Sequence, residues 1–141
     1  MTPVMTRAEM QDYLWEVFPQ VRGHFSVEHI DGAVTVMRMP VTDQNLRPGG
    51  TVSGPTMFAL ADVAAYAATL AHIGREALAV TTNCSIDFMR KPSADADLIA
   101  TAEVLKLGKS LSVVDIRICS EGQKAPVARA TLTYSIPPKR D

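Results

Sequence analysis

The chain has 141 residues, of which 47% are hydrophobic and 21% are charged, and its formal net charge is -1. This composition indicates one soluble globular domain over residues 1–141 and excludes a disordered chain, because a single domain usually has ~100–150 residues and a hydrophobic core. Fourteen Lys and Arg are spread among fifteen Asp and Glu, so there is no basic stripe and nucleic acid is not an expected partner.

The N-terminal region predicts a helix over residues 6–18. Thr6 and Glu9 have the spacing of a capping box. The apolar residues that follow recur at helical spacing and form one stripe: Met10, Tyr13, Leu14, Val17 and Phe18. Pro19 is expected to end this helix.

The location of the protein is predicted from its first residues and its cysteines. The segment Met1 to Glu9 lacks the apolar run of a secretory signal. Cys84 and Cys119 lie in apolar, strand-like segments, where buried reduced thiols are favoured over a disulfide. We therefore expect a cytoplasmic protein.

A hairpin over residues 24–40 follows the first helix. Asp31-Gly32 is a strong signal for a two-residue turn, and it joins two extended segments, His24–Ile30 and Ala33–Met39. The next segment, Thr42–Gly54, is rich in glycine and proline and is predicted to be a loop.

A long apolar helix is predicted over residues 55–73. Pro55 suits its first turn and Gly74 its end. Its ionisable residues are Asp62 and His72, and it is long enough to be considered as a membrane span. Because alanine drives insertion weakly and a central Asp costs about 2.5–3.5 kcal/mol on insertion scales, a buried helix is favoured and no membrane partner is expected.

Residues 77–136 are predicted to form four strands. They are Leu78–Met89, Leu98–Leu107, Leu111–Cys119 and Val127–Ile136. The turns between them are short, so we predict a meander in which consecutive strands pair. In the first strand, simple alternation places Thr81 with Asn83, Ser85 and Asp87 on a polar face.

The order of these elements predicts an α+β fold. A curved six-stranded antiparallel sheet would wrap around the long helix, with the short N-terminal helix outside. Because such a sheet covers one side of a helix that is apolar on nearly all sides, we expect a second copy to cover the rest, in a homodimer or homotetramer. An ordinary two-layer α+β sandwich is the alternative.

The stretch from Asn45 to Asp62, NLRPGGTVSGPTMFALAD, resembles the signature of hotdog thioesterases of the phenylacetate-pathway type. That signature has Asn, a short glycine loop, His-Gly-Gly, and Leu-Ala-Asp within the central helix. The stretches Val80–Arg90 and Leu105–Ser110 look alike as well, so the resemblance covers most of residues 34–136. It implies the hotdog fold and acyl-CoA thioesterase activity.

The resemblance also implies roles for individual residues. Asp62 falls on the catalytic acid of the family, Thr81 on a Ser or Thr that holds the attacking water, and Asn45 on the first residue of the signature. Two positions depart from the pattern, because Ser53 replaces the histidine and Pro55 the second glycine. The loop after Asn45 is also about two residues longer than usual.

Elementary chemistry supports two of these assignments. The N–H groups at the start of a helix suit a developing oxyanion. Since Pro55 has no N–H, Gly54 or Thr56 must supply the donor, and Gly54 is favoured because a chain can approach a ligand closely at glycine. Asp62 lies among alanines with Phe58 and Tyr66 one turn away, a setting for a general base or nucleophile. A structural Asp in a helix interface is the alternative.

The remaining candidates are divided between binding and plain structural roles. Ser53 lacks the Gly-X-Ser-X-Gly context of a nucleophile and is favoured as a helix cap. By resemblance, the basic residues near the coenzyme A phosphates are Arg90, Lys91 and Lys109, with Ser110 beside them; solvated turn charges are the alternative. Candidates for the acyl pocket are Met57, Phe58, Tyr66 and Met89, although such side chains are more often core. Pro55 is a further candidate for substrate binding.

These inferences predict an acyl-CoA thioesterase that acts on small or medium acyl groups. Coenzyme A enters as part of the substrate, and no other cofactor is expected. His24, His29 and His72 share no metal-ligand spacing, so no metal site is predicted. A non-catalytic acyl-CoA binding protein is the alternative function, and a hotdog dehydratase ranks below it because its Asp or His pair is not found.

Overall fold

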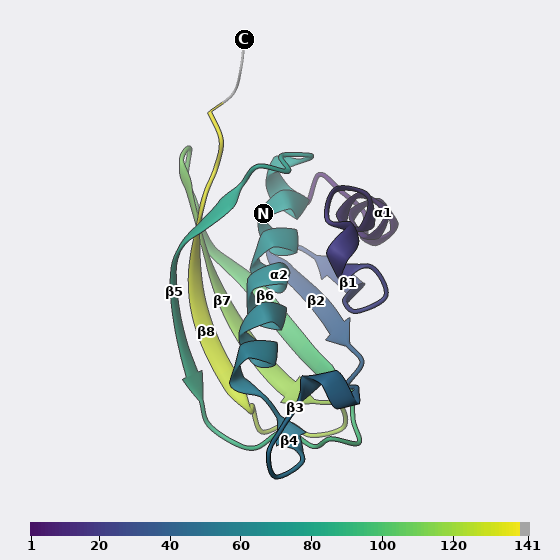
Figure 1. Cartoon of the computed structure of the whole chain (residues 1–141). Coiled ribbons are helices and arrows are strands. Elements are labelled where there is room, and N and C mark those ends of the chain that lie inside the picture. Colours follow the sequence, from purple (N-terminus) through teal and green to yellow (C-terminus); the bar gives the residue numbers. More distant parts are fainter. Residues whose placement is uncertain (139–141) are drawn as a thin grey trace.

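A six-stranded antiparallel sheet curves around one long helix in the computed structural model, which describes residues 1–138 (Figure 1). The last three residues of the predicted domain therefore lie outside the description. The helices are α1 (Arg7–Val17) and α2 (Gly54–Ile73). The strands of the sheet are β1 (Ser26–Asp31), β2 (Val34–Met39), β5 (Val80–Phe88), β6 (Leu98–Leu107), β7 (Leu111–Ser120) and β8 (Ala128–Ser135). This arrangement confirms the predicted hotdog fold.

The strand order differs from the predicted four-stranded meander in one place. The order is β1-β2-β6-β7-β8-β5, so β6, β7 and β8 do form a meander. The predicted pairing of β5 with β6 is wrong, because β5 pairs with β8 at the edge of the sheet and β6 pairs with β2. Residues 89–97 instead run past the end of the sheet from one side to the other. This crossing places α2 against the middle strands, with strands of the same sheet on both sides of it (Figure 1).

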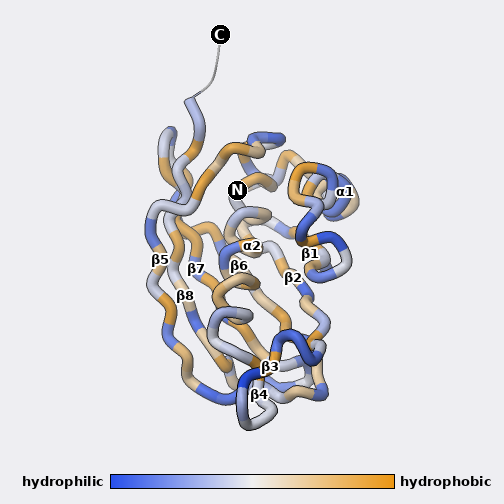
Figure 2. The backbone as a smooth tube through the Cα atoms, in the orientation of Figure 1, coloured by the Kyte–Doolittle hydropathy of each residue, from blue (hydrophilic) through white to orange (hydrophobic). Residues whose placement is uncertain are grey.

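The inner face of the sheet has small residues where α2 packs closely. Hydrophobic and hydrophilic residues alternate along the strands, as Figure 2 shows, and the inward residues of β6 and β8 are buried. Four of these inward residues are alanines: Ala100, Ala102, Ala128 and Ala130. Since alanine also dominates α2, helix and sheet approach each other closely. A buried hydrogen bond from Thr69 Oγ1 to Ser112 Oγ (2.9 Å) links α2 to β7.

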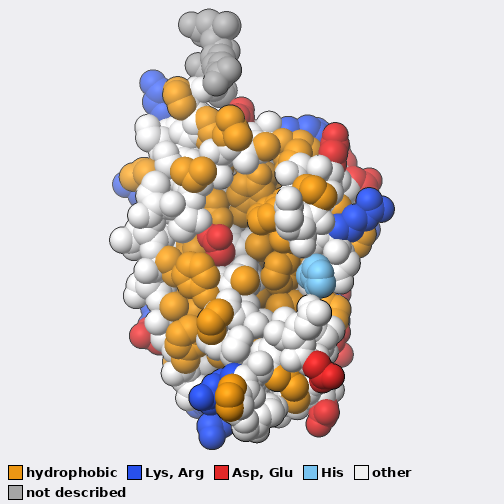
Figure 3. Space-filling view, in the orientation of Figure 1, with side chains coloured by type: hydrophobic (Ala, Val, Ile, Leu, Met, Phe, Trp, Pro, Cys, Tyr) orange, Lys and Arg blue, Asp and Glu red, His pale blue; other side chains and the backbone are white. Residues whose placement is uncertain are grey.

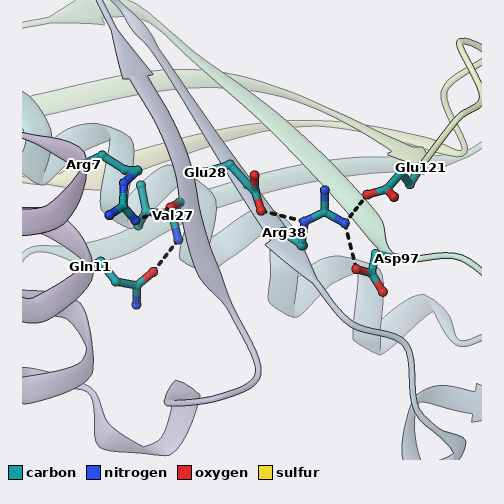
Figure 4. Close-up of polar contacts among 7 residues, drawn as sticks. All are labelled: Arg7, Gln11, Val27, Glu28, Arg38, Asp97 and Glu121. Carbon is teal, nitrogen blue, oxygen red and sulfur yellow. Dashed lines mark hydrogen bonds and ion pairs between the residues drawn. The ribbon is translucent and has the colours of Figure 1, made fainter.

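The N-terminal segment packs against part of α2 and adds to the burial of this helix within a single chain. The amide of Val4 donates to the carbonyl of Ala71 (2.7 Å). Helix α1 is held on β1 because Arg7 Nη1 donates to the carbonyl of Val27 (3.1 Å) and Gln11 Oε1 accepts from its amide (2.6 Å; Figure 4). Pro55 and Phe58 are the exposed residues of α2. By length and composition α2 passes as a membrane span, but 72% of its most apolar window is buried within the chain.

A set of ion pairs centred on Arg38 fixes the other end of the outer strands. Arg38 donates to Glu28 (2.6 Å) and to Asp97 (2.8 Å), and also pairs with Glu121 (Figure 4). The hydrogen bond that Arg38 donates to Asp97, followed by those that it donates to Glu28 and Glu121, raises the pKa of Arg38. These contacts join β1 and β2 to the segments before β6 and after β7.

Candidate active site

The first turn of α2 leaves one backbone N–H without a protein partner. Ser53 is the N-cap, and its Oγ accepts a hydrogen bond from the amide of Thr56 (3.3 Å). Pro55 has no N–H, and the amide of Met57 donates to the carbonyl of Ser53 (3.2 Å). Within residues 1–138, the amide of Gly54 is therefore the backbone donor of this turn that has no protein acceptor and is available to a ligand. The interpretation of Ser53 as a helix cap is confirmed.

Asn45 positions the start of α2 through its backbone. Its carbonyl accepts from the amide of Ser53 (2.8 Å), across the short hairpin of β3 (Leu46–Arg47) and β4 (Thr51–Val52). Its side-chain Oδ1 accepts from the amide (2.8 Å) and the hydroxyl (3.1 Å) of Thr42. The side chain thus closes the turn that precedes the hairpin.

The carboxylate of Asp62 accepts two hydrogen bonds at the same oxygen. Thr81 Oγ1 donates to Asp62 Oδ1 at 2.5 Å, and the hydroxyl of Tyr134 donates to it at 2.7 Å. Asp62 is half-buried and Tyr134 is only 3% exposed. Since both donors use Oδ1, Oδ2 is the oxygen available to a reacting group.

A β-bulge brings Thr81 to Asp62, and this corrects the predicted face of Thr81. The pairing of β5 with β8 shifts register between Thr81 and Asn83. Thr81 therefore lies opposite Tyr134, and Cys84 lies opposite the buried Leu132, so both face α2. Simple alternation had separated Thr81 from Cys84. A bulge adds one residue to a strand, so the side chains that follow it point to the opposite face from the one that simple alternation predicts.

Tyr134 is a site residue that the sequence reading missed. It continues the inward row of β8, and its hydroxyl is the one feature that distinguishes it from a core residue in that row. Burial raises the pKa of Tyr134, and the nearby charge of Asp62 raises it further, so the phenol stays protonated and remains a donor.

Burial and the carboxylate of Asp62 also raise the pKa of the Cys84 thiol. Cys84 and Cys119 are both free, as predicted, and both are half-buried.

Two cavities contain more than half of the predicted site residues, and they differ in charge. The first has a volume of about 360 Å³ and is lined by Gly54, Met57, Phe88, Arg90 and Lys91, together with Arg47. The second has a volume of about 270 Å³ and is lined by Asp62, Tyr66, Thr81 and Tyr134, together with the end of α1. Figure 3 shows a hollow over α2 with hydrophobic side chains along it and an acidic side chain at its β5 edge. Within residues 1–138, no three His, Cys, Asp or Glu side chains gather as a metal site would require.

Gly54 and Asp62 of one chain lie too far apart to act on the same carbonyl. They are eight positions apart on α2, and a helix rises ~1.5 Å per residue, which separates them by ~12 Å along the axis. Each cavity of a single chain therefore holds one half of the predicted machinery.

Four predicted binding residues lie outside both cavities. Pro55 and Phe58 are exposed on α2 and line neither. Lys109 and Ser110 are in the turn before β7, where Ser110 accepts from the amide of Ile136 (2.8 Å). Arg90 lies beyond the other end of β7, with its Nη1 donating to Pro126 (2.8 Å). Since a ten-residue strand spans ~33 Å, the predicted grouping of Lys109 with Arg90 is wrong within one chain.

Comparisons with known proteins agree with this architecture. The model of the family "Thioesterase superfamily" matches residues 49–127. The acyl-coenzyme A thioesterase PaaI of Escherichia coli K12 is 38% identical over 96 residues, which are 67% of this chain and 66% of that enzyme, so the match spans slightly under two thirds of its length.

Two solved structures extend the likeness. A candidate thioesterase from Silicibacter sp. TM1040 is 58% identical, with a TM-score of 0.92 and coverage of 98% of this chain and 96% of that one. The Escherichia coli PaaI protein from the phenylacetic acid degradation operon is 30% identical, with a TM-score of 0.73 and coverage of 91% and 95%. Since the family model covers more than half of the sequence and the fold is shared, the chain belongs to the thioesterase superfamily.

Proposed function

We propose that this protein hydrolyses the thioester of a small or medium acyl-CoA to the free acid and coenzyme A. The observation that carries the proposal is the carboxylate of Asp62, which lines a cavity with one oxygen held by Thr81 and Tyr134 and the other oxygen available. Membership of the thioesterase superfamily and the likeness to PaaI support it.

In the proposed reaction Asp62 acts as a general base. Asp62 takes a proton from water as the water oxygen attacks the thioester carbon, and Thr81 orients that water. The amide of Gly54 stabilises the oxyanion of the tetrahedral intermediate. The C–S bond then breaks, and the proton on Asp62 passes to the coenzyme A sulfur. These steps use protein groups and water, with no cofactor beyond the coenzyme A of the substrate.

Direct attack by Asp62 is the other form of the same proposal. Its carboxylate oxygen would bond to the thioester carbon and expel the coenzyme A thiolate, which takes a proton from water and leaves hydroxide. The hydroxide would then attack the mixed anhydride, which restores the carboxylate of Asp62 and releases the acid.

We further propose that two copies share each active site. Strand β5 is an edge strand, and several large hydrophobic side chains near it are exposed: Phe58, Leu78, Val80, Phe88 and Met89. If the β5 strands of two copies pair antiparallel, the Phe88 end of one lies beside the Val80 end of the other. Gly54 lies against the ring of Phe88, so this pairing would bring it toward Asp62 of the partner. A homodimer is the smallest such assembly, and a homotetramer would join two of them.

The charges of the first cavity support a place for the coenzyme A phosphates there. Arg90 and Lys91 line it with Arg47, which the sequence reading did not select. In the proposed dimer Lys109 and Ser110 of the partner would approach this end of β5, which restores the predicted basic group across two chains.

We also propose a cytoplasmic location, in keeping with the free thiols of Cys84 and Cys119.

The test follows release of free coenzyme A thiol from aliphatic and aromatic acyl-CoA substrates by the wild type and by Asp62→Asn. We expect turnover by the wild type and a loss of at least about 1,000-fold in the variant, since the base or nucleophile is removed. Equal rates would remove Asp62 from the reaction.

The alternative of a non-catalytic acyl-CoA binding protein is motivated by Ser53 and Pro55, which replace the histidine and the second glycine of the family pattern. A wild type that binds several acyl-CoA molecules and releases thiol from none would establish this alternative. Calorimetric titration with the same acyl-CoA panel measures that binding.

A further inference from the structure

The end of α1 forms part of the cavity that contains Asp62. Val17, the last residue of α1, and Phe18, its C-cap, both line this cavity together with Val63, Tyr66 and Val80. Val17 and Phe18 are 36% and 38% exposed, so neither residue is buried in the core. Neither residue belongs to the segment 49–127 that the family model matches.

The described residues that line this cavity include no Lys or Arg, whereas Arg47, Arg90 and Lys91 all line the first cavity. The second cavity therefore does not suit a phosphate. Its hydroxyl groups are engaged within the chain, since Tyr66 donates to the carbonyl of Ala77 (2.7 Å) and Tyr134 donates to Asp62. An acyl chain whose carbonyl lies at Asp62 would therefore place its apolar end against the remaining walls.

The end of α1 is held firmly enough to act as a wall. Met10 and Leu14 anchor α1 in the core with 0% exposure. The indole N–H of Trp15 donates to the carbonyl of Phe25 (2.9 Å), and the guanidinium of Arg22 lies 5.7 Å from the Trp15 ring centroid. Pro19 follows Phe18 and ends the helix at this point. The position of Phe18 is therefore fixed by contacts on both sides of it.

We infer that Phe18, supported by Val17, limits the length of the acyl group that the protein accepts. Both residues form the α1 wall of the cavity that contains Asp62, so a long fatty acyl chain whose carbonyl lies at Asp62 meets this wall, whereas a short or medium chain does not extend as far. This inference rests on the proposed function.

The experiment varies the wall and the acyl length together. Phe18→Ala enlarges the cavity and Phe18→Trp reduces it, while Glu16→Ala changes an exposed neighbour on α1 that lines neither cavity and serves as the matched control. For each protein, kcat/KM is measured with acetyl-, butyryl-, hexanoyl-, phenylacetyl- and dodecanoyl-CoA. Dissociation constants are measured by calorimetry with the non-hydrolysable S-methyl, S-hexyl and S-dodecyl thioethers of coenzyme A.

In Phe18→Ala we expect the ratio of kcat/KM for dodecanoyl-CoA to that for hexanoyl-CoA to rise about tenfold or more. In Phe18→Trp we expect the ratio of kcat/KM for hexanoyl-CoA to that for acetyl-CoA to fall by a similar factor. The reason is that the fit of methylene groups in an apolar pocket changes the discrimination between substrates by ~10–200-fold. Glu16→Ala keeps the wild-type ratios. Unchanged ratios in both Phe18 variants would overturn the inference. If the wild type hydrolyses none of the substrates, the proposed function is wrong. The ratio of the dissociation constants for the S-dodecyl and S-hexyl thioethers, compared between the wild type and the Phe18 variants, then tests separately whether Phe18 limits the acyl length.

Discussion

At the scale of single residues, the hydroxyl of Tyr134 is predicted to position the carboxylate of Asp62. Tyr134→Phe removes one of two hydrogen bonds to Oδ1, and we expect kcat to fall about tenfold, because a hydrogen bond to a charged group contributes about 1.5–3 kcal/mol. Thr81→Val removes the other hydrogen bond and should have a similar effect. Steady-state kinetics on thioester substrate measure both.

Two further measurements separate positioning from a loss of folding. Thr81→Ser retains a hydroxyl at the same place and should recover most of the activity lost in Thr81→Val. Thermal unfolding of Tyr134→Phe should change little, since the ring stays in the core. If Tyr134→Phe unfolds at a much lower temperature, or Thr81→Ser is as impaired as Thr81→Val, this role is wrong.

The amide of Gly54 is tested by a matched pair of substitutions. A Cβ at position 54 would lie 3.3 Å from the exposed ring of Phe88 in both Gly54→Ala and Gly54→Pro, but only proline removes the N–H. Ser53 is extended, with φ -72° and ψ 152°, and so tolerates a following proline. We expect kcat to fall ~100–1,000-fold in Gly54→Pro and only a few-fold in Gly54→Ala. Equal losses in the two variants would assign the effect to the added carbon.

Seven of the site residues that the sequence identified lie within one continuous stretch, from Asn45 to Asp62, where spacing along the chain determines geometry. Ser53 as a cap and Gly54 as a donor follow from the helix start alone. Tyr134 and Phe88 could not be found in this way, because their places depend on strand pairing between distant segments. Their types and local patterns are those of ordinary core residues.

At the scale of elements, α1 is predicted to depend on its capping box. Thr6 Oγ1 accepts from the amide of Glu9 (3.1 Å), and Glu9 Oε1 accepts from the amide of Thr6 (3.0 Å). Thr6→Ala should lower the unfolding free energy by about 1 kcal/mol, which corresponds to a decrease in Tm of about 2–4 °C for a chain of this size. Differential scanning calorimetry measures the shift. Thr6→Ser keeps the cap and should match the wild type, and an equal decrease in both variants would show that the cap contributes nothing.

Elements were predictable where their signals are local. The capping box, Pro19, Asp31-Gly32 and Gly74 each mark a boundary that lies within a few residues of the observed one. The partner of β5 and the bulge at Thr81 were not predictable, since both follow from how the sheet closes over α2. A pattern that alternates along β5 contains no sign of one extra residue, because the bulge is defined by the register of β8.

At the scale of the whole molecule, an apolar helix did not by itself determine an oligomer. The N-terminal segment and the sheet bury nearly all of α2 from Leu60 to His72, a cover that the sequence reading assigned to a second copy. The stronger reason for an assembly is the edge strand β5, with Val80 and Phe88 more than half exposed. An exposed apolar edge strand favours pairing with another chain.

The proposed sharing of the active site between two chains makes a prediction that a mixture of two inactive variants can test. In a dimer with sites shared between chains, Asp62→Asn and Gly54→Pro would each inactivate both sites of a homodimer. In the mixed dimer, however, Asp62 of the Gly54→Pro chain meets Gly54 of the Asp62→Asn chain, so one site is intact. Random exchange makes half of the dimers mixed with one of two sites active, so about a quarter of wild-type activity should return after co-refolding at equal concentrations. If each chain held its own site, no mixed dimer would contain an intact one, and the activity of the mixture would equal the mean of the two inactive variants.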